Sequence, residues 1–206
     1  MCPHRNPRRT RGEVTPELAL RYLMEGNQRY VSKTSFIEER HVNLIDAHVP
    51  IAAVLGCSDA RVGAELIFDQ DAGELFVVRL AGNFVSDYGQ ASLEYAVQVL
   101  NVPLVLVLGH TNCGAVTAAV NIVETGETLP GRMFVLIDAL EPSVLRARET
   151  NPDDLIDHAV HLNVMRQVER LRSISPLIND AIARGQTMVV GAVYHMDSGQ
   201  VELLDH

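Results

Sequence analysis

The sequence has no tryptophan, few cysteines and fewer basic than acidic residues, and these shortages exclude several classes of protein. Lysine and arginine number 17 against 26 aspartates and glutamates, which gives a formal net charge of −9 at pH 7. This balance disfavours nucleic acid as a partner, because binding a polyanion over a broad face requires a basic footprint. No apolar run approaches the roughly 18 residues of a membrane-spanning helix, so we expect no membrane association.

The three cysteines are an odd number and make a poor disulfide framework. They favour a reduced, cytoplasmic setting, in which Cys57 and Cys113 bind a metal, act in catalysis or are simply buried. Cys2 lies in an arginine-rich start that no apolar stretch follows, so no secretory signal is expected. We expect residues 1–14 to be a disordered basic tail and residues 15–206 to form a single α/β domain.

Short apolar stretches alternate with helical patterns along the chain. Four continuous apolar runs are typical of strands buried on both faces: 51–56, 75–79, 104–109 and 187–193. Helices are predicted over 16–26, 90–100, 132–140, 153–173 and 176–184. A turn at 197–199 leads into an antiparallel edge strand over 200–204. The predicted fold class is therefore α/β, with a mainly parallel central sheet flanked by helices and an antiparallel edge strand.

Candidate metal ligands follow two of these strands. Cys57 comes directly after the first strand, and His110 and Cys113 come directly after the third. Because the carboxyl ends of parallel strands meet at one edge of a sheet, we expect all three to face one crevice. His110 and Cys113 would point the same way if they lay on one helical turn. Two thiolates and an imidazole suit zinc and leave a fourth position open, as in catalytic sites; ordinary packing is the alternative for each residue alone.

Asp59 and Arg61 lie two residues apart in the segment that begins at Cys57. On extended backbone they would point the same way, so that Arg61 holds Asp59 ionised and fixed. Near zinc, such a carboxylate either orients the nucleophile or ligates the metal itself and closes the site. A salt bridge that only stabilises the loop is the third interpretation.

These residues belong to longer motifs that resemble the β-class carbonic anhydrases. The motifs are Cys57-Ser58-Asp59-Ala60-Arg61-Val62, Phe76-Val77-Val78-Arg79, Ala81-Gly82-Asn83, Glu94-Tyr95-Ala96-Val97, Gly109-His110-Thr111-Asn112-Cys113-Gly114-Ala115, Asn163-Val164, Ser175-Pro176 and Gly191-Ala192-Val193-Tyr194. They extend over roughly residues 15–204. The resemblance implies a β-carbonic anhydrase-like fold and the reversible hydration of carbon dioxide to bicarbonate and a proton.

The resemblance also implies roles for individual residues. Cys57, His110 and Cys113 would bind one zinc ion per chain, with zinc-bound hydroxide as the nucleophile and the Asp59–Arg61 dyad orienting it. Asp59 would be a fourth zinc ligand in the closed form that some members adopt. Because two thiolates offset the charge of zinc, we expect the active form to require mildly alkaline pH.

The family's substrate pocket maps onto Phe76, Ala81 and Tyr95, with the backbone of Gly114 nearby. His48 stands where many members have a glutamine that forms the polar wall of the pocket. Phe76 and Tyr95 also fit an apolar core. In the family this pocket lies at an interface between copies, which implies a homodimer or tetramer.

Two other functions stay open at this point. One is hydrolysis of a related linear molecule, carbon disulfide or carbonyl sulfide, on the same fold. The other is a non-catalytic zinc or redox-sensing module, which an intact Asp59–Arg61 dyad disfavours. The closed, bicarbonate-regulated form is disfavoured by Val54, which replaces a tryptophan of the switchable members, and favoured by Gly56, which those members share.

Overall fold

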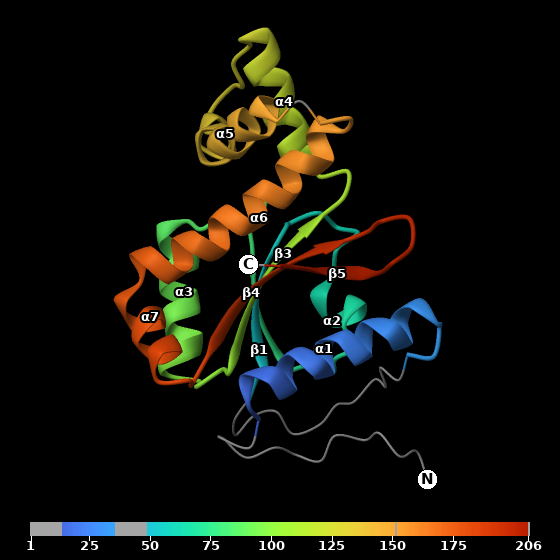
Figure 1. Cartoon of the computed structure of the whole chain (residues 1–206), viewed down its shortest axis with the longest axis vertical. Helices are drawn as coiled ribbons and strands as arrows, with labels where there is room; N and C mark the ends of the chain where they lie inside the picture. Colours follow the sequence, from blue (N-terminus) through green and yellow to red (C-terminus); the bar gives the residue numbers. More distant parts are fainter. Residues whose placement is uncertain (1–13, 36–48, 151, 206) are drawn as a thin grey trace.

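The computed structural model describes residues 14–35, 49–150 and 152–205. Within them, five strands form one sheet in the order β2-β1-β3-β4-β5 (Figure 1). The strands are β1 (Ala52–Gly56), β2 (Leu75–Arg79), β3 (Leu104–His110), β4 (Met188–Tyr194) and β5 (Val201–Leu204). All neighbouring pairs are parallel except β4 and β5, which are antiparallel. The predicted fold class is confirmed, including the antiparallel edge strand.

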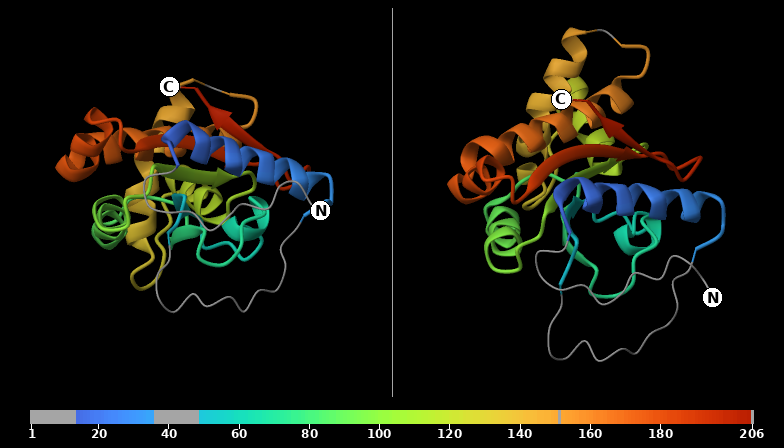
Figure 2. Two further views of the ribbon diagram at one scale, coloured as in Figure 1. Left: turned by 90° about the horizontal axis from the view of Figure 1, so that it is seen from below. Right: turned by 60° about the horizontal axis from the view of Figure 1, so that its bottom comes forward.

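Helices cover both faces of this sheet. They are α1 (Pro16–Val31), α2 (Ala64–Ile67), α3 (Asp87–Gln98), α4 (Gly114–Thr125), α5 (Phe134–Glu149), α6 (Leu155–Ile174) and α7 (Pro176–Ala183). Side chains of α1 and α2 pack into the apolar cluster of one face, and those of α3 to α7 into the cluster of the other. Figure 2 shows α1 and α6 on opposite sides of the strands.

The central strands are buried on both faces because their apolar side chains alternate between the two clusters. In β1, Ala53 and Leu55 face the α6 side, whereas Ala52 and Val54 face the α1 side. This alternation explains why the strands appear in the sequence as continuous apolar runs rather than as alternating patterns.

The long helix α6 lies close against β3 and β4 because two strand glycines leave room for it. A Cβ at Gly109 would lie 2.6 Å from Val164 Cγ2, and one at Gly191 would lie 2.7 Å from Val164 Cγ1. These contacts are closer than side chains tolerate, so glycine is required where the helix crosses the sheet.

Four helices differ from the sequence prediction. Helix α5, expected over 132–140, continues through Pro142 to Glu149, and the short helix α2 is not predicted. Thr15 caps α1 as expected, but the helix continues beyond Gly26 to Val31. A Cβ at Gly26 would lie 1.8 Å from the Phe68 carbonyl oxygen, so this glycine allows close approach of α2 and does not end the helix. Helix α4, directly after Cys113, is not predicted by the sequence patterns at all.

Two predictions fall on residues outside the described ranges. These are the basic tail, of which residues 1–13 are not described, and the pocket position His48. Within the described ranges, no helix combines the length and the apolar character needed to cross a membrane.

Candidate metal centre

The first candidate ligand, Cys57, leaves the end of β1 and enters a loop held by its neighbours. The Leu80 amide donates to the Gly56 carbonyl (3.1 Å), and the Ser58 amide donates to the Leu80 carbonyl (3.3 Å). These bonds join the ends of β1 and β2, so the chain around Cys57 is fixed by the sheet rather than by a long loop.

The other two candidates, His110 and Cys113, converge through a tight turn. His110 is the last residue of β3, and Cys113 is the N-cap of α4. Asn112 between them has φ 55°, a left-handed conformation that asparagine adopts more readily than most residues. The expectation that both side chains point the same way is met by this turn, not by a shared helical turn.

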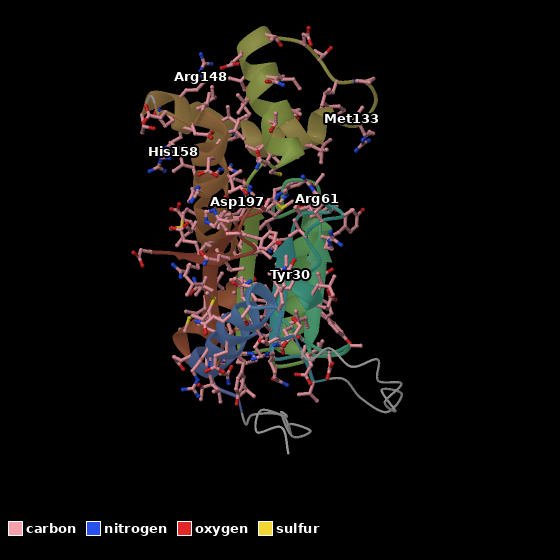
Figure 3. All side chains as sticks on the ribbon, turned by 90° about the vertical axis from the view of Figure 1, so that its right-hand side faces the viewer. Tyr30, Arg61, Met133, Arg148, His158 and Asp197 are labelled. Carbon is pink, nitrogen blue, oxygen red and sulfur yellow. The ribbon has the colours of Figure 1, made fainter. Side chains whose placement is uncertain are left out.

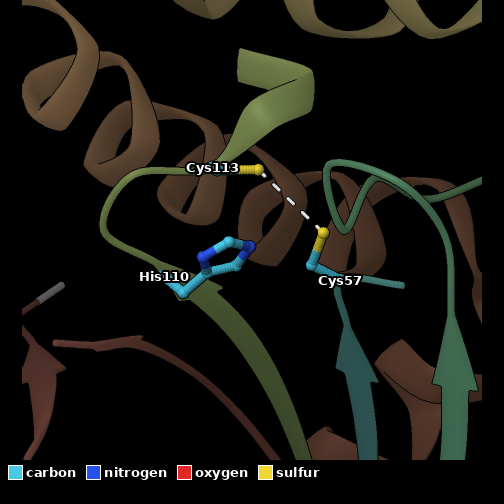
Figure 4. Close-up of side chains that lie close together, drawn as sticks. All are labelled: Cys57, His110 and Cys113. Atoms are coloured by element: carbon cyan, nitrogen blue, oxygen red, sulfur yellow. Dashed lines mark hydrogen bonds between the residues drawn. The ribbon is translucent and has the colours of Figure 1, made fainter. Parts of the chain in front are cut away.

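Cys57, His110 and Cys113 form a buried cluster at the carboxyl edge of the sheet (Figure 4). Their ligand atoms all lie within 4.8 Å of one another, and the two Sγ atoms are 4.0 Å apart. Two sulfurs each about 2.3 Å from a tetrahedral zinc would be about 3.8 Å apart, so the spacing fits. The cluster could therefore hold a metal ion.

The imidazole of His110 is oriented for this role. Its Nδ1 lies 2.9 Å from the Thr111 carbonyl oxygen, which can only accept, so Nδ1 carries the proton. Its Nε2 therefore has a free lone pair; this atom is buried and has no hydrogen-bond partner in the structure. A buried acceptor left without a partner is costly, and a metal ligand bond would satisfy it.

The two thiols are hydrogen-bonded to each other. The hydrogen bond between them lowers the pKa of Cys57 to about 4, against the effect of burial. The same bond, together with burial, raises the pKa of Cys113 far above its usual range. A metal ion bound by both sulfurs would take the place of the thiol protons.

Asp59 and Arg61 are joined as predicted, but by a different local geometry. The Arg61 amide and Nε donate to Asp59 Oδ1 at 3.0 and 2.9 Å, and Arg61 Nη2 donates to Oδ2 at 2.7 Å. The backbone bond makes an Asx turn rather than an extended segment. The Arg61 side chain, which is more than half exposed, holds the pKa of Asp59 well below its usual range. In Figure 3, Arg61 lies below Met133 and above Tyr30.

Arg79 is a residue to which the sequence motifs assign no role. Its Nε donates to the Cys57 carbonyl at 2.9 Å, and its Nη2 donates to the Asp59 carbonyl. Arg79 therefore fixes the backbone that carries both Cys57 and Asp59. A charged residue at the end of a predicted strand, level with the candidate site, is the sequence signal for it.

The predicted pocket residues lie at different distances from the cluster. Ala81 directly precedes Gly82, whose amide lies 3.4 Å from Cys57 Sγ, and Gly114 follows Cys113 as the first residue of α4. Phe76 pairs with Ala53 in the sheet, three residues or about 10 Å of strand before the level of Gly56. Phe76 and Tyr95 pack together with ring centroids 6.3 Å apart.

A set of two thiols and one imidazole, with fewer than four protein ligands, is typical of catalytic rather than structural metal sites. At the carboxyl edge of a mainly parallel sheet, such a ligand set is typical of α/β metalloenzymes.

The comparisons with known proteins identify the family within this class. The family model for carbonic anhydrase matches residues 52–201. A carbonic anhydrase of Mycolicibacterium smegmatis is 38% identical over 196 residues, covering 93% of this chain and 94% of its own length. Carbonic anhydrase 2 of Mycobacterium tuberculosis is 38% identical over 197 residues, covering 94% of this chain and 95% of its own. The solved structure of the β-carbonic anhydrase CcaA has a TM-score of 0.72 and 30% identity, covering 90% of this chain and 87% of that one.

The chain belongs to the β-carbonic anhydrase family. The resemblance inferred from the motifs is thereby confirmed, and so is the prediction that the protein is an enzyme of this family.

Proposed function

We propose that the protein is a zinc-dependent carbonate dehydratase, which hydrates carbon dioxide reversibly to bicarbonate and a proton. The observation that carries this proposal is the buried Cys57–His110–Cys113 cluster, with its unpartnered imidazole nitrogen, in a chain of this family. Free thiols at Cys57 and Cys113 support the accompanying proposal of a reduced, cytoplasmic location.

In this proposal the two sulfurs and His110 Nε2 hold one zinc ion per chain. Bound there, zinc acts as a Lewis acid that makes water a competent nucleophile near neutral pH. The hydrogen bond at Nδ1 keeps the His110 ring in the tautomer that presents Nε2. Cys113 lies at the N-terminus of the 12-residue helix α4, where the backbone N–H groups of Ala115 and Val116 lower its pKa and so oppose part of the rise caused by Cys57 and burial.

Asp59 orients the nucleophile in this mechanism. Because Arg61 keeps the Asp59 carboxylate ionised, Asp59 can only accept hydrogen bonds. It accepts one from the attacking water, which directs a lone pair of the water oxygen towards carbon dioxide. The Arg61 bonds support the form in which Asp59 orients water rather than the form in which it ligates the metal.

The substrate pocket is completed, in our proposal, by a second copy of the chain. Tyr95 is 50% exposed and packs on Phe76, whose strand position is level with Ala53, three residues before the end of β1. A homodimer, or a tetramer built from dimers, would bring this apolar pair to the partner's site.

The test is metal analysis combined with stopped-flow assays of carbon dioxide, carbonyl sulfide and carbon disulfide, side by side. We expect about one zinc per chain in the parent protein and activity on carbon dioxide. Cys113→Ser should lose most of the zinc and the activity, because it removes a thiolate ligand. The control is Cys2→Ser, which removes the cysteine outside the cluster and should change neither. Full zinc occupancy in Cys113→Ser, or activity on the sulfur compounds alone, would contradict the proposal.

A further inference from the structure

A chain of buried amides connects α6 to the turn beside Cys57. Gln167 Oε1 accepts a hydrogen bond from the Val85 amide (3.0 Å), and Gln167 Nε2 donates to Asn163 Oδ1 (2.9 Å). Asn163 Nδ2 then donates to the Gly82 carbonyl (3.0 Å). Both amide side chains are 1% exposed, so each of these bonds is made in the protein interior.

The direction of every bond in this chain is fixed by its ends. The Val85 amide can only donate, so the oxygen of Gln167 faces it; the Gly82 carbonyl can only accept, so the nitrogen of Asn163 faces it. The two side chains lie at i and i+4 on α6 and meet in between. A shift of the segment Gly82–Val85 would break these bonds and leave buried polar groups unsatisfied.

The segment held in this way ends on the metal cluster. The Gly82 amide lies 3.4 Å from Cys57 Sγ and is directed at it as a hydrogen-bond donor. Gly82 has φ +84°, and a Cβ there would lie 2.9 Å from Leu140 Cδ1. The turn is thus held from α6 by hydrogen bonds and limited from α5 by packing, and the Gly82 N–H meets the ligand sulfur.

We propose that Asn163 and Gln167 are positioning residues, which hold the Gly82 N–H against Cys57 Sγ and thereby strengthen zinc binding. The inference rests on the proposed zinc site. An N–H that donates to a ligand sulfur stabilises the negative charge of the thiolate and fixes its direction. Neither side chain touches the metal ligands, so their effect acts through the Gly82 turn.

The first measurement uses the parent protein with NMR-active cadmium in place of zinc. If the Gly82 N–H donates to the ligand sulfur, its proton shows a through-bond coupling to cadmium by way of Cys57 Sγ. Absence of this coupling would overturn the proposal without any variant having to fold.

The second measurement compares zinc affinity by chelator competition. Asn163→Leu removes both bonds of the asparagine and should weaken zinc binding about 10–100-fold, the effect typical of losing an outer-shell partner. Gln167→Met leaves the Asn163–Gly82 bond in place and should weaken zinc binding less. The cadmium coupling to Gly82 should decrease in both variants, and more in Asn163→Leu than in Gln167→Met.

Asn27→Leu is the matched control. Asn27 is also a buried helix asparagine, 4% exposed, which donates to the Ile67 and Gly199 carbonyls and accepts from the Val201 amide. Asn27 lies on the α1 face, away from the cluster. The Asn27→Leu variant should therefore be less stable, while its zinc affinity and its cadmium coupling stay unchanged.

Two outcomes separate this inference from the proposed function. Unchanged zinc affinity and coupling in Asn163→Leu, in a protein whose parent hydrates carbon dioxide, would overturn the positioning role alone. A parent that binds zinc and shows the Gly82 coupling, but does not hydrate carbon dioxide, would contradict the proposed function and support the positioning role.

Discussion

At the scale of single residues, the Asp59–Arg61 pair places a fixed negative charge beside the Cys57–His110–Cys113 cluster. Arg61 makes three hydrogen bonds to the Asp59 carboxylate, one of them from the backbone. Most of the Arg61 side chain is exposed, so this pair contributes little to stability. The geometry instead gives Asp59 a fixed orientation and a fixed charge, which are the properties that an orienting group requires.

Asp59→Asn should lower turnover by roughly 10²-fold while zinc content stays near that of the parent. The amide keeps the shape but can present its NH₂ group to the nucleophile, which reverses the required hydrogen bond, and positioned catalytic groups typically contribute this much. Stopped-flow rates and metal analysis on the same sample measure the two quantities. Asp180→Asn is the control, because Asp180 pairs with Arg184 at i and i+4 on the surface of α7.

The pH dependence of this variant follows from the lowered pKa of Asp59. Any stability from the pair is present above the ordinary value of 3.8 and is lost only as pH falls through the lower folded value. Asp59 therefore stays ionised above about pH 5, and Asp59→Asn should reduce turnover across the neutral range without moving the midpoint of the profile. An activity that rises at low pH would instead make Asp59 the closing ligand.

At the scale of secondary-structure elements, the position of α6 matters most, because this helix both covers the sheet and carries Asn163 and Gln167. Its approach depends on Gly109 and Gly191, which face Val164. Both glycines lie on strands that end at the site: β3 ends at His110. The packing of one helix and the geometry of the metal cluster are thus set by the same contacts.

Gly109→Ala should lower the free energy of unfolding by about 1–3 kcal/mol, since the added methyl overlaps Val164 Cγ2 and forces α6 away from β3. Urea denaturation at fixed protein and zinc concentrations measures this change. Gly56→Ala is the control: it is also a buried strand glycine, but an added Cβ would meet only Val54 Cγ1 at 3.9 Å. Equal stability of the two variants would show that α6 moves without cost.

The sequence patterns were sufficient for the sheet but not for every helix. The strands are predictable because burial on both faces leaves continuous apolar runs. Helix α4 was not predicted although its buried residues, Val116, Ala119 and Val120, have helical spacing; no capping side chain marks its start at Cys113. Gly26 misleads as a helix end because its close approach to Phe68 is a tertiary contact.

The candidate metal ligands were predictable because they follow strand ends, whereas the groups proposed to position them were not. Asn163 and Gln167 lie on a helix rich in charged residues, where polar side chains usually face solvent. Only the packing of α6 on the sheet shows that this pair is buried. Likewise, the Asx turn of Asp59 depends on local backbone geometry that spacing alone does not specify.

At the scale of the whole molecule, exposed apolar surface lies beside the open edge of the sheet. β2 is an edge strand, and its central residues are only half-buried. Tyr95 on α3 is 50% exposed, and Val99, which caps this helix, is 47% exposed; α3 packs against β2. An edge strand flanked by exposed apolar side chains favours covering by another chain.

Tyr95→Glu should therefore shift the protein from a dimer, or a multiple of a dimer, towards the monomer, because it places a charge in the apolar surface beside β2. Light scattering at micromolar concentration gives the mass of parent and variant. Leu145→Glu is the control: Leu145 is 45% exposed on α5, a helix that packs against α4 and α6, and this variant should keep the mass of the parent. If a second copy also completes the pocket, the monomeric variant should lose activity while it keeps its zinc. A parent protein that is already monomeric at this concentration would contradict both the assembly and the shared pocket.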